Sequence, residues 1–98
     1  YDKRGIGMSD TCMRYIVSGL VQGVGFRYHT CHEGLKRGLT GYAKNLDNGD
    51  VEIVASGDPE KLESLHVWLK EGPSSARVDR LITEGIAFRH FKGFDIEY

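Results

Sequence analysis

The stretch GLVQGVGFR, residues 19–27, joins an apolar segment of β type to the start of a helix through a glycine-rich turn. Its glycines accept backbone angles that other residues avoid, so successive N–H groups can point into one concavity. The first turn of a helix adds unpaired N–H donors and the positive end of the helix dipole. Arg27 adds a planar guanidinium group whose donors match phosphate oxygens. The stretch therefore predicts a strand, a metal-free phosphate-binding loop and a helix, in that order.

Two better-known phosphate loops do not fit this stretch. A P-loop ends in Gly-Lys-Ser/Thr, whereas this loop ends in Gly25, Phe26 and Arg27. A dinucleotide-binding fingerprint requires a third glycine, and Tyr28 occupies that position. From the loop alone, the alternative is a tight strand-to-helix turn with an arginine on the surface.

A second stretch, GYAKNLDNGDVEIVASG over residues 41–57, predicts a β-hairpin, because two alternating runs flank a turn rich in Asp, Asn and Gly. Asn45 shares one strand face with Ala43 and Gly41, so its amide has small neighbours. Asparagine is unfavourable within a strand, and a residue that breaks a local rule is a candidate functional residue. The alternative is that Asn45 begins the turn and caps its own backbone.

The other segments complete a β-α-β-β-α-β order with an additional short strand at the end. Asp58 as a cap and Pro59 at the first helical position mark the start of a second helix, and Gly72 marks its end. This order predicts a ferredoxin-like α/β sandwich of the α+β class, with one antiparallel sheet and both helices on one face. We expect strands at residues 13–19, 39–47, 51–56, 76–84 and 94–98, and the first helix at residues 26–37.

Local patterns add detail to these elements. The first helix carries Tyr28, Cys31 and Leu35 at a spacing of i, i+3 and i+7, which places them on one face. Gly34 weakens this helix by up to about 1 kcal/mol relative to alanine and suggests a close approach to the sheet. In the long strand after the second helix the alternation slips at residues 81–82, which predicts a β-bulge there.

Together the two stretches resemble the signature motifs of the acylphosphatase family, of the small bacterial type. Residues 19–27 match its Gly-x-Val-Gln-Gly-Val-x-Phe-Arg loop. Residues 41–45 match its Gly-aromatic-Ala-Lys-Asn motif, and the downstream glycine, valine and glycine are also present. The motifs are long and ordered, and the likeness extends from about residue 15 to the C-terminal residue.

The resemblance implies an enzyme that hydrolyses carboxyl-phosphate mixed anhydrides without a metal. It implies that Arg27 and Asn45 are the catalytic residues: the arginine binds the phosphate, and the asparagine holds the attacking water. The backbone N–H groups implied in phosphate binding are those of Gln22, Gly23, Val24, Gly25, Phe26 and Arg27. Arg37 departs from the family pattern, in which a leucine is common before the glycine, and this departure concerns helix packing rather than the site.

Composition limits the partners that we expect. A chain of 98 residues suffices for one domain with a core, and its formal net charge is −1 with no cluster of Lys and Arg. We therefore expect no nucleic-acid partner, which would require a basic face. No apolar run approaches the length of a membrane span, and no signal-peptide core is recognisable, so we expect no membrane partner and a cytoplasmic location. We expect a monomer whose partners are the acyl phosphate substrate and inorganic phosphate.

No metal or other cofactor is expected. His29, Cys31 and His32 lie close together, but no second cluster of His, Cys or acidic residues has metal-ligand spacing. Cys12 and Cys31 are expected to be reduced thiols, because two cysteines do not make a disulfide-rich framework. A catalytic cysteine would need a lowered pKa and a nearby base, so Cys31 is interpreted as a small core residue.

Residues 1–12 are expected to form an N-terminal extension that is poorly ordered, and residues 13–98 an acylphosphatase-like domain, with Met8 or Met13 as the natural start. The alternatives are a non-catalytic domain of the same fold that binds phosphate or carbamoyl phosphate, and a plain interaction module. The preferred acyl group is not defined by the sequence, because neither the loop nor the hairpin contains a defined acyl pocket.

Overall fold

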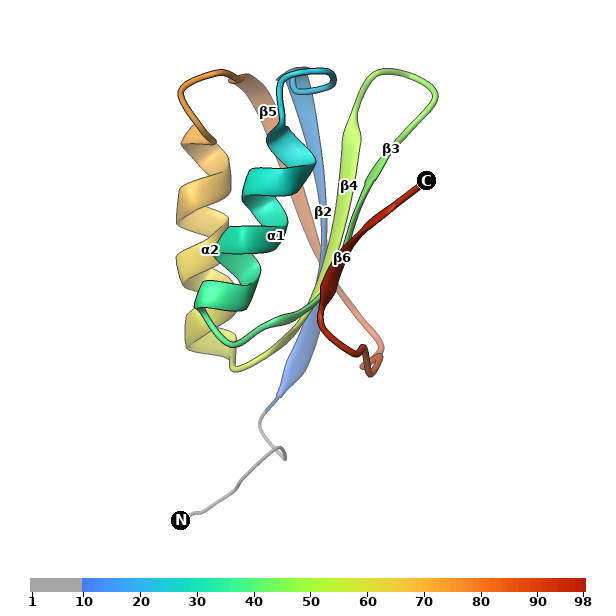
Figure 1. Cartoon of the computed structure of the whole chain (residues 1–98). Helices are drawn as coiled ribbons and strands as arrows, with labels where there is room; N and C mark the ends of the chain where they lie inside the picture. Colours follow the sequence, from blue (N-terminus) through green and yellow to red (C-terminus); the bar gives the residue numbers. More distant parts are fainter. Residues whose placement is uncertain (1–9) are drawn as a thin grey trace.

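A computed structural model describes residues 10–98, which form two helices and five strands (Figure 1). In chain order the elements are β2 Thr11–Leu20, α1 Phe26–Lys36, β3 Thr40–Asn45, β4 Val51–Gly57, α2 Pro59–Glu71, β5 Arg77–Ile86 and β6 Phe94–Glu97. Both helices cover the same face of the sheet, as Figure 1 shows. The ferredoxin-like α+β fold predicted from the element order is confirmed. Neither helix of these residues is long and apolar enough to cross a membrane.

The sheet begins earlier in the chain than predicted. Strand β2 starts at Thr11, which pairs with Gly57, and Cys12 is buried beside its partner Ser56. Thr11 and Cys12 therefore belong to the sheet and not to an N-terminal extension, because the long strand β4 offers them backbone partners. Residues 1–9 of the predicted extension lie outside the described residues.

The strands follow the order β5-β2-β4-β3-β6 across the sheet. The pairs β2–β4, β2–β5 and β3–β4 are antiparallel, as predicted. β6 instead pairs parallel with β3, with Gly41 opposite Phe94, so the sheet is mixed. The physical reason is the direction of β5: the chain must reverse after this strand, and it returns at the far edge of the sheet in the same direction as β3.

The core lies between the helices and the covered face of the sheet. α2 contributes a buried stripe of Leu62, Leu65 and Leu69. Trp68 of the same helix stacks on Phe26 of α1, with 6.2 Å between the ring centroids. Arg37, which follows α1, donates a hydrogen bond of 2.8 Å to the hydroxyl of Ser64 and so links the two helices with a polar contact.

The helix face that α1 buries differs from the face predicted from its large apolar residues. Tyr28 and Leu35 are 66% and 53% exposed and are not core residues. Gly34 permits the observed packing, because a Cβ atom at this position would collide with the ring of Phe94 in β6. The close approach predicted for this glycine is therefore confirmed. The residues that α1 buries are Phe26, Thr30, Cys31 and Gly34.

The irregularity in the edge strand β5 lies next to the glycine-rich loop and not at the predicted place. The pairing of β2 with β5 shifts between Ser18 and Gly19, which makes Asp79 the additional residue of a bulge. Leu81 and Ile82 pair in register with β2. Leu81 packs against the core whereas Ile82 is exposed, so two adjacent apolar residues here reflect the two faces of the strand.

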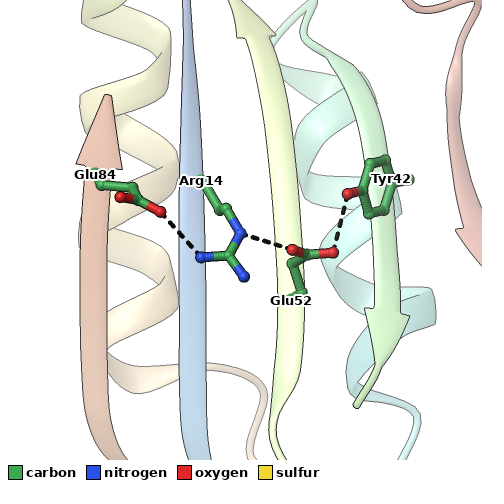
Figure 2. Close-up of polar contacts among 4 residues, drawn as sticks. All are labelled: Arg14, Tyr42, Glu52 and Glu84. Carbon is green, nitrogen blue, oxygen red and sulfur yellow. Dashed lines mark hydrogen bonds and ion pairs between the residues drawn. The ribbon is translucent and has the colours of Figure 1, made fainter. Parts of the chain in front are cut away.

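A polar network links four strands on the face of the sheet that the helices leave open (Figure 2). Arg14 of β2 donates to Glu52 of β4 over 2.6 Å and to Glu84 of β5 over 2.9 Å. Tyr42 of β3 donates to the other oxygen of Glu52 over 2.9 Å. Burial raises the pKa of Glu52, but the hydrogen bonds from Arg14 and Tyr42 outweigh this effect and hold the pKa below its usual value.

Candidate active site

The glycine-rich loop between β2 and α1 has the backbone conformation that its sequence predicts. Gly23 has φ of 75°, and Gly25 is the N-cap of α1 with φ of 77° and ψ of 13°. Side chains rarely adopt these left-handed angles, so glycine is required at both positions. The carbonyl of Gly25 accepts the first helical hydrogen bond from the N–H of His29, over 3.1 Å. No acidic residue occupies the first turn of α1, so no carboxylate competes with an anion for its N–H groups.

The side chain of Gln22 fixes the loop to the β3–β4 hairpin. Its Nε2 atom donates to the carbonyl oxygens of Leu46 and Asp50, each over 2.8 Å. On the other side, the hydroxyl of Ser75 donates to the carbonyl of Val24 over 2.8 Å. The loop is thus held at both sides by segments distant in sequence. From the sequence, only the backbone N–H of Gln22 was expected to take part in the site. The amide side chain of this residue in the motif is the signal that could have indicated its second role.

Arg27 lies in the first turn of α1 and lines the same hollow as the loop. The hollow has a volume of about 120 Å³, well above the roughly 10–15 Å³ that one water molecule needs. The guanidinium of Arg27 donates to the carbonyl of Glu97 over 3.4 Å and lies 5.2 Å from the centroid of the Tyr98 ring. The guanidinium of Arg27 therefore lies against the end of β6 as well as beside the loop. The residues that line the hollow are Val21, Gly23, Gly25, Phe26, Arg27, Tyr28 and Ile96.

Asn45 is the last residue of β3, where it pairs with Val51 of β4. Its side-chain oxygen is buried and accepts no hydrogen bond from any residue in the range 10–98. Such an acceptor costs about 1–3 kcal/mol, so it is available for a donor such as a water molecule. The turn that follows is capped by Asn48, whose side-chain oxygen accepts from the N–H of Asp50 over 3.0 Å. The capping role considered for Asn45 is thus filled by another asparagine.

The loop, the start of α1 and the end of β3 lie at the same end of the molecule (Figure 1). Gln22 provides the direct connection, since its two acceptors flank the turn that begins after Asn45. β6 provides a second one, because Glu97 pairs with Lys44 and also accepts the hydrogen bond from Arg27. Arg27 and Asn45 therefore stand on elements that are tied together at this end of the molecule, although Asn45 is not among the residues that line the hollow.

The histidines and cysteines near the site have structural or surface positions. Cys31 is buried, and burial raises the pKa of its thiol to about 11, so it is neutral near pH 7 and is no activated nucleophile. His29 and His32 lie exposed on α1. In residues 10–98 no group of three His, Cys, Asp or Glu side chains could hold a metal ion.

These features define a class of protein: a small ferredoxin-like domain in which a glycine loop, a helix N-terminus and an arginine surround one hollow, and a buried amide oxygen without a partner lies at the end of a neighbouring strand. The family model for acylphosphatases matches residues 13–96. The chain is 59% identical over 90 residues to an acylphosphatase of Vibrio cholerae, covering 91% of this chain and 99% of that relative. The chain therefore belongs to the acylphosphatase family.

Solved structures agree with this assignment. An acylphosphatase structure from Coxiella burnetii superposes with a TM-score of 0.87 at 39% identity, covering 91% of this chain and 94% of that one. A structure of full-length HypF in a phosphate- and nucleotide-bound form matches with a TM-score of 0.87 at 26% identity. That match covers 97% of this chain but only 13% of HypF, so the same fold also occurs as a small part of a larger protein.

Proposed function

We propose that Arg27 and Asn45 are the catalytic residues of this acylphosphatase. The reaction is the hydrolysis of a carboxyl-phosphate mixed anhydride to a carboxylate and inorganic phosphate. The observation that carries the assignment is the buried, unpartnered oxygen of Asn45 on a hairpin that Gln22 ties to the loop beside Arg27. An acceptor placed beside an anion site suits a water molecule that attacks a bound phosphoryl group.

The phosphoryl oxygens bind to the guanidinium of Arg27 and to the backbone N–H groups of residues 22–27. These donors are preorganised, so they stabilise the charge of the transition state without reorganising during the reaction. Charge-assisted hydrogen bonds from a guanidinium are about twice as strong as neutral ones, and its fork matches two phosphoryl oxygens at once. Arg27 therefore contributes both to binding and to turnover.

The side-chain oxygen of Asn45 accepts a hydrogen bond from the attacking water and holds it in line with the leaving carboxylate. The bond from the water oxygen to phosphorus forms as the bond from phosphorus to the acyl oxygen breaks, and the acyl oxygen leaves as a carboxylate. The water proton passes to a phosphoryl oxygen of the substrate. A carboxylate is a good leaving group, so positioning and charge stabilisation suffice and no side chain has to act as general base.

The proposal includes no metal and no other cofactor, because the loop N–H groups and Arg27 supply the positive potential. We also propose that the protein is a monomer in the cytoplasm whose partners are the acyl phosphate and inorganic phosphate. We propose that it binds neither nucleic acid nor a membrane. The formal net charge of −1 supports the absence of a nucleic-acid partner. The alternative is a domain that binds phosphate or carbamoyl phosphate without turnover.

The test is hydrolysis of benzoyl phosphate by the full chain, before and after exhaustive chelation. The proposal predicts turnover that saturates with substrate, is inhibited by inorganic phosphate and is unchanged by EDTA. Phosphate binding without turnover would support the non-catalytic alternative. Turnover that is lost with EDTA and restored by a divalent ion would contradict the metal-free mechanism.

A further inference from the structure

A groove with a largely apolar lining runs between α1 and β6, next to the phosphate hollow. It has a volume of about 310 Å³, at the lower end of the range of about 300–1,000 Å³ that is usual for small-molecule sites. Phe94 forms part of its lining and is buried because Gly34 leaves space for the ring against the helix. The groove is therefore a consequence of how closely β6 approaches α1.

The groove adjoins the phosphate hollow. Tyr28 and Ile96 line both of them, one from the first turn of α1 and one from β6. Cys31 and Leu35 extend the lining along the helix, and the seven-residue step from Tyr28 to Leu35 corresponds to a rise of about 10 Å. The groove thus begins where a phosphoryl group would be bound and leads away from it.

The lining of the groove favours uncharged acyl groups over charged ones. Tyr28, Cys31, Leu35 and Ile96 present aromatic, thiol and aliphatic groups, and Cys31 is a neutral thiol because burial raises its pKa to about 11. Asp95 and His32 also line the groove, but no lysine or arginine does. A second phosphate or a carboxylate on the acyl group would find no fixed cation there, whereas an uncharged chain would find apolar surface.

From the shared border at Tyr28 and Ile96 and from the apolar lining we infer that the groove between α1 and β6 is the acyl subsite, and that it favours substrates with an extended, uncharged apolar acyl chain. The inference rests on the proposed acylphosphatase function and specifies its substrate class. Leu35 is the discriminating residue. It is 53% exposed, lies two helical turns beyond the hollow and does not line the hollow itself, so only long acyl chains reach it. This exposure of a large apolar residue is what an acyl chain would cover.

The test compares acetyl, butyryl and octanoyl phosphate as substrates. We expect kcat/KM of the wild type to rise with chain length, by about tenfold or more from acetyl to octanoyl, because each methylene buried in an apolar pocket adds binding. Leu35→Ser should remove most of the advantage of octanoyl phosphate and leave acetyl phosphate unchanged. Val67→Ser is the matched control, since Val67 is 56% exposed on α2 and does not line the groove.

The outcomes distinguish a failure of the proposed acyl subsite from a failure of the proposed acylphosphatase function. If the three substrates are hydrolysed with equal kcat/KM, or if Leu35→Ser lowers all three equally, the acyl subsite is wrong while the acylphosphatase function stands. The same conclusion follows if Val67→Ser reduces the octanoyl advantage as much as Leu35→Ser does. If none of the three substrates is hydrolysed, the proposed function fails and the subsite fails with it.

Discussion

Arg27 is the residue that we propose binds the phosphate, and the surrounding backbone suits this role. It stands at a helix N-terminus, where free N–H groups already favour an anion. Among residues 10–98, the side chain of Arg27 donates a hydrogen bond only to the carbonyl of Glu97. That bond is 3.4 Å long and exposed, so it holds the guanidinium weakly. A phosphate that offers two oxygens would therefore exchange a weak neutral contact for charge-assisted ones.

Replacing Arg27 tests this role. Arg27→Gln should lose hydrogen bonds worth about 1.5–3 kcal/mol each, which corresponds to a loss of phosphate affinity of about tenfold to hundredfold for each bond. Arg27→Lys should also bind phosphate poorly, because an ammonium group lacks the planar fork. Titration with inorganic phosphate measures both effects, and Arg80→Gln is the control, since Arg80 is exposed on β5. Unchanged affinity in Arg27→Gln would refute the assignment.

The elements of the fold position the site through contacts that a sequence pattern only partly reveals. The loop, both helices and the hairpin follow from glycine positions, caps and alternation, because these signals are local. Periodicity showed that Tyr28 and Leu35 share a face, but not that this face borders a groove. The face that meets the sheet contains Thr30 and Gly34, which no hydrophobicity scale marks as core. The pairing of β6 depends on the whole sheet and has no local signal.

The polar network on the open face gives a prediction for the pH dependence of stability. Hydrogen bonds from Arg14 and Tyr42 hold the pKa of Glu52 below its unfolded value, in spite of burial. Glu52 therefore adds stability at pH values above its unfolded pKa of about 4.3, and this contribution is lost as pH falls through the lower, folded pKa. Urea unfolding between pH 7 and pH 3 should show a smaller acid-induced loss for Glu52→Gln than for the wild type. Equal losses in the two proteins would show that the network does not contribute.

In the molecule as a whole, Arg27 comes from helix α1 and Asn45 from strand β3, and both elements present these residues at one end of the sheet. Family motifs predicted Arg27 and Asn45 as the catalytic residues, because each stands in a long ordered pattern. They did not identify the side-chain bonds of Gln22 or the contact of Arg27 with Glu97, since these join segments that are far apart in sequence. The acyl groove could not be predicted from the sequence for the same reason. Its walls come from α1 and from β6, which are far apart in sequence, and neither element forms a pocket alone.

We propose that Asn45 acts on the attacking water and not on the phosphate. A group used mainly in the transition state lowers kcat without weakening ground-state binding. The decisive measurement combines benzoyl phosphate turnover with phosphate titration of Asn45→Ala, and Asn48→Ala in the same hairpin serves as control. Asn45→Ala should lose turnover by about 10²–10³-fold. It should still bind phosphate, which at about 100 times its Kd should still stabilise the fold against urea by about 2.7 kcal/mol. Near-normal turnover, or a loss of phosphate affinity that matches the loss of rate, would contradict the claim.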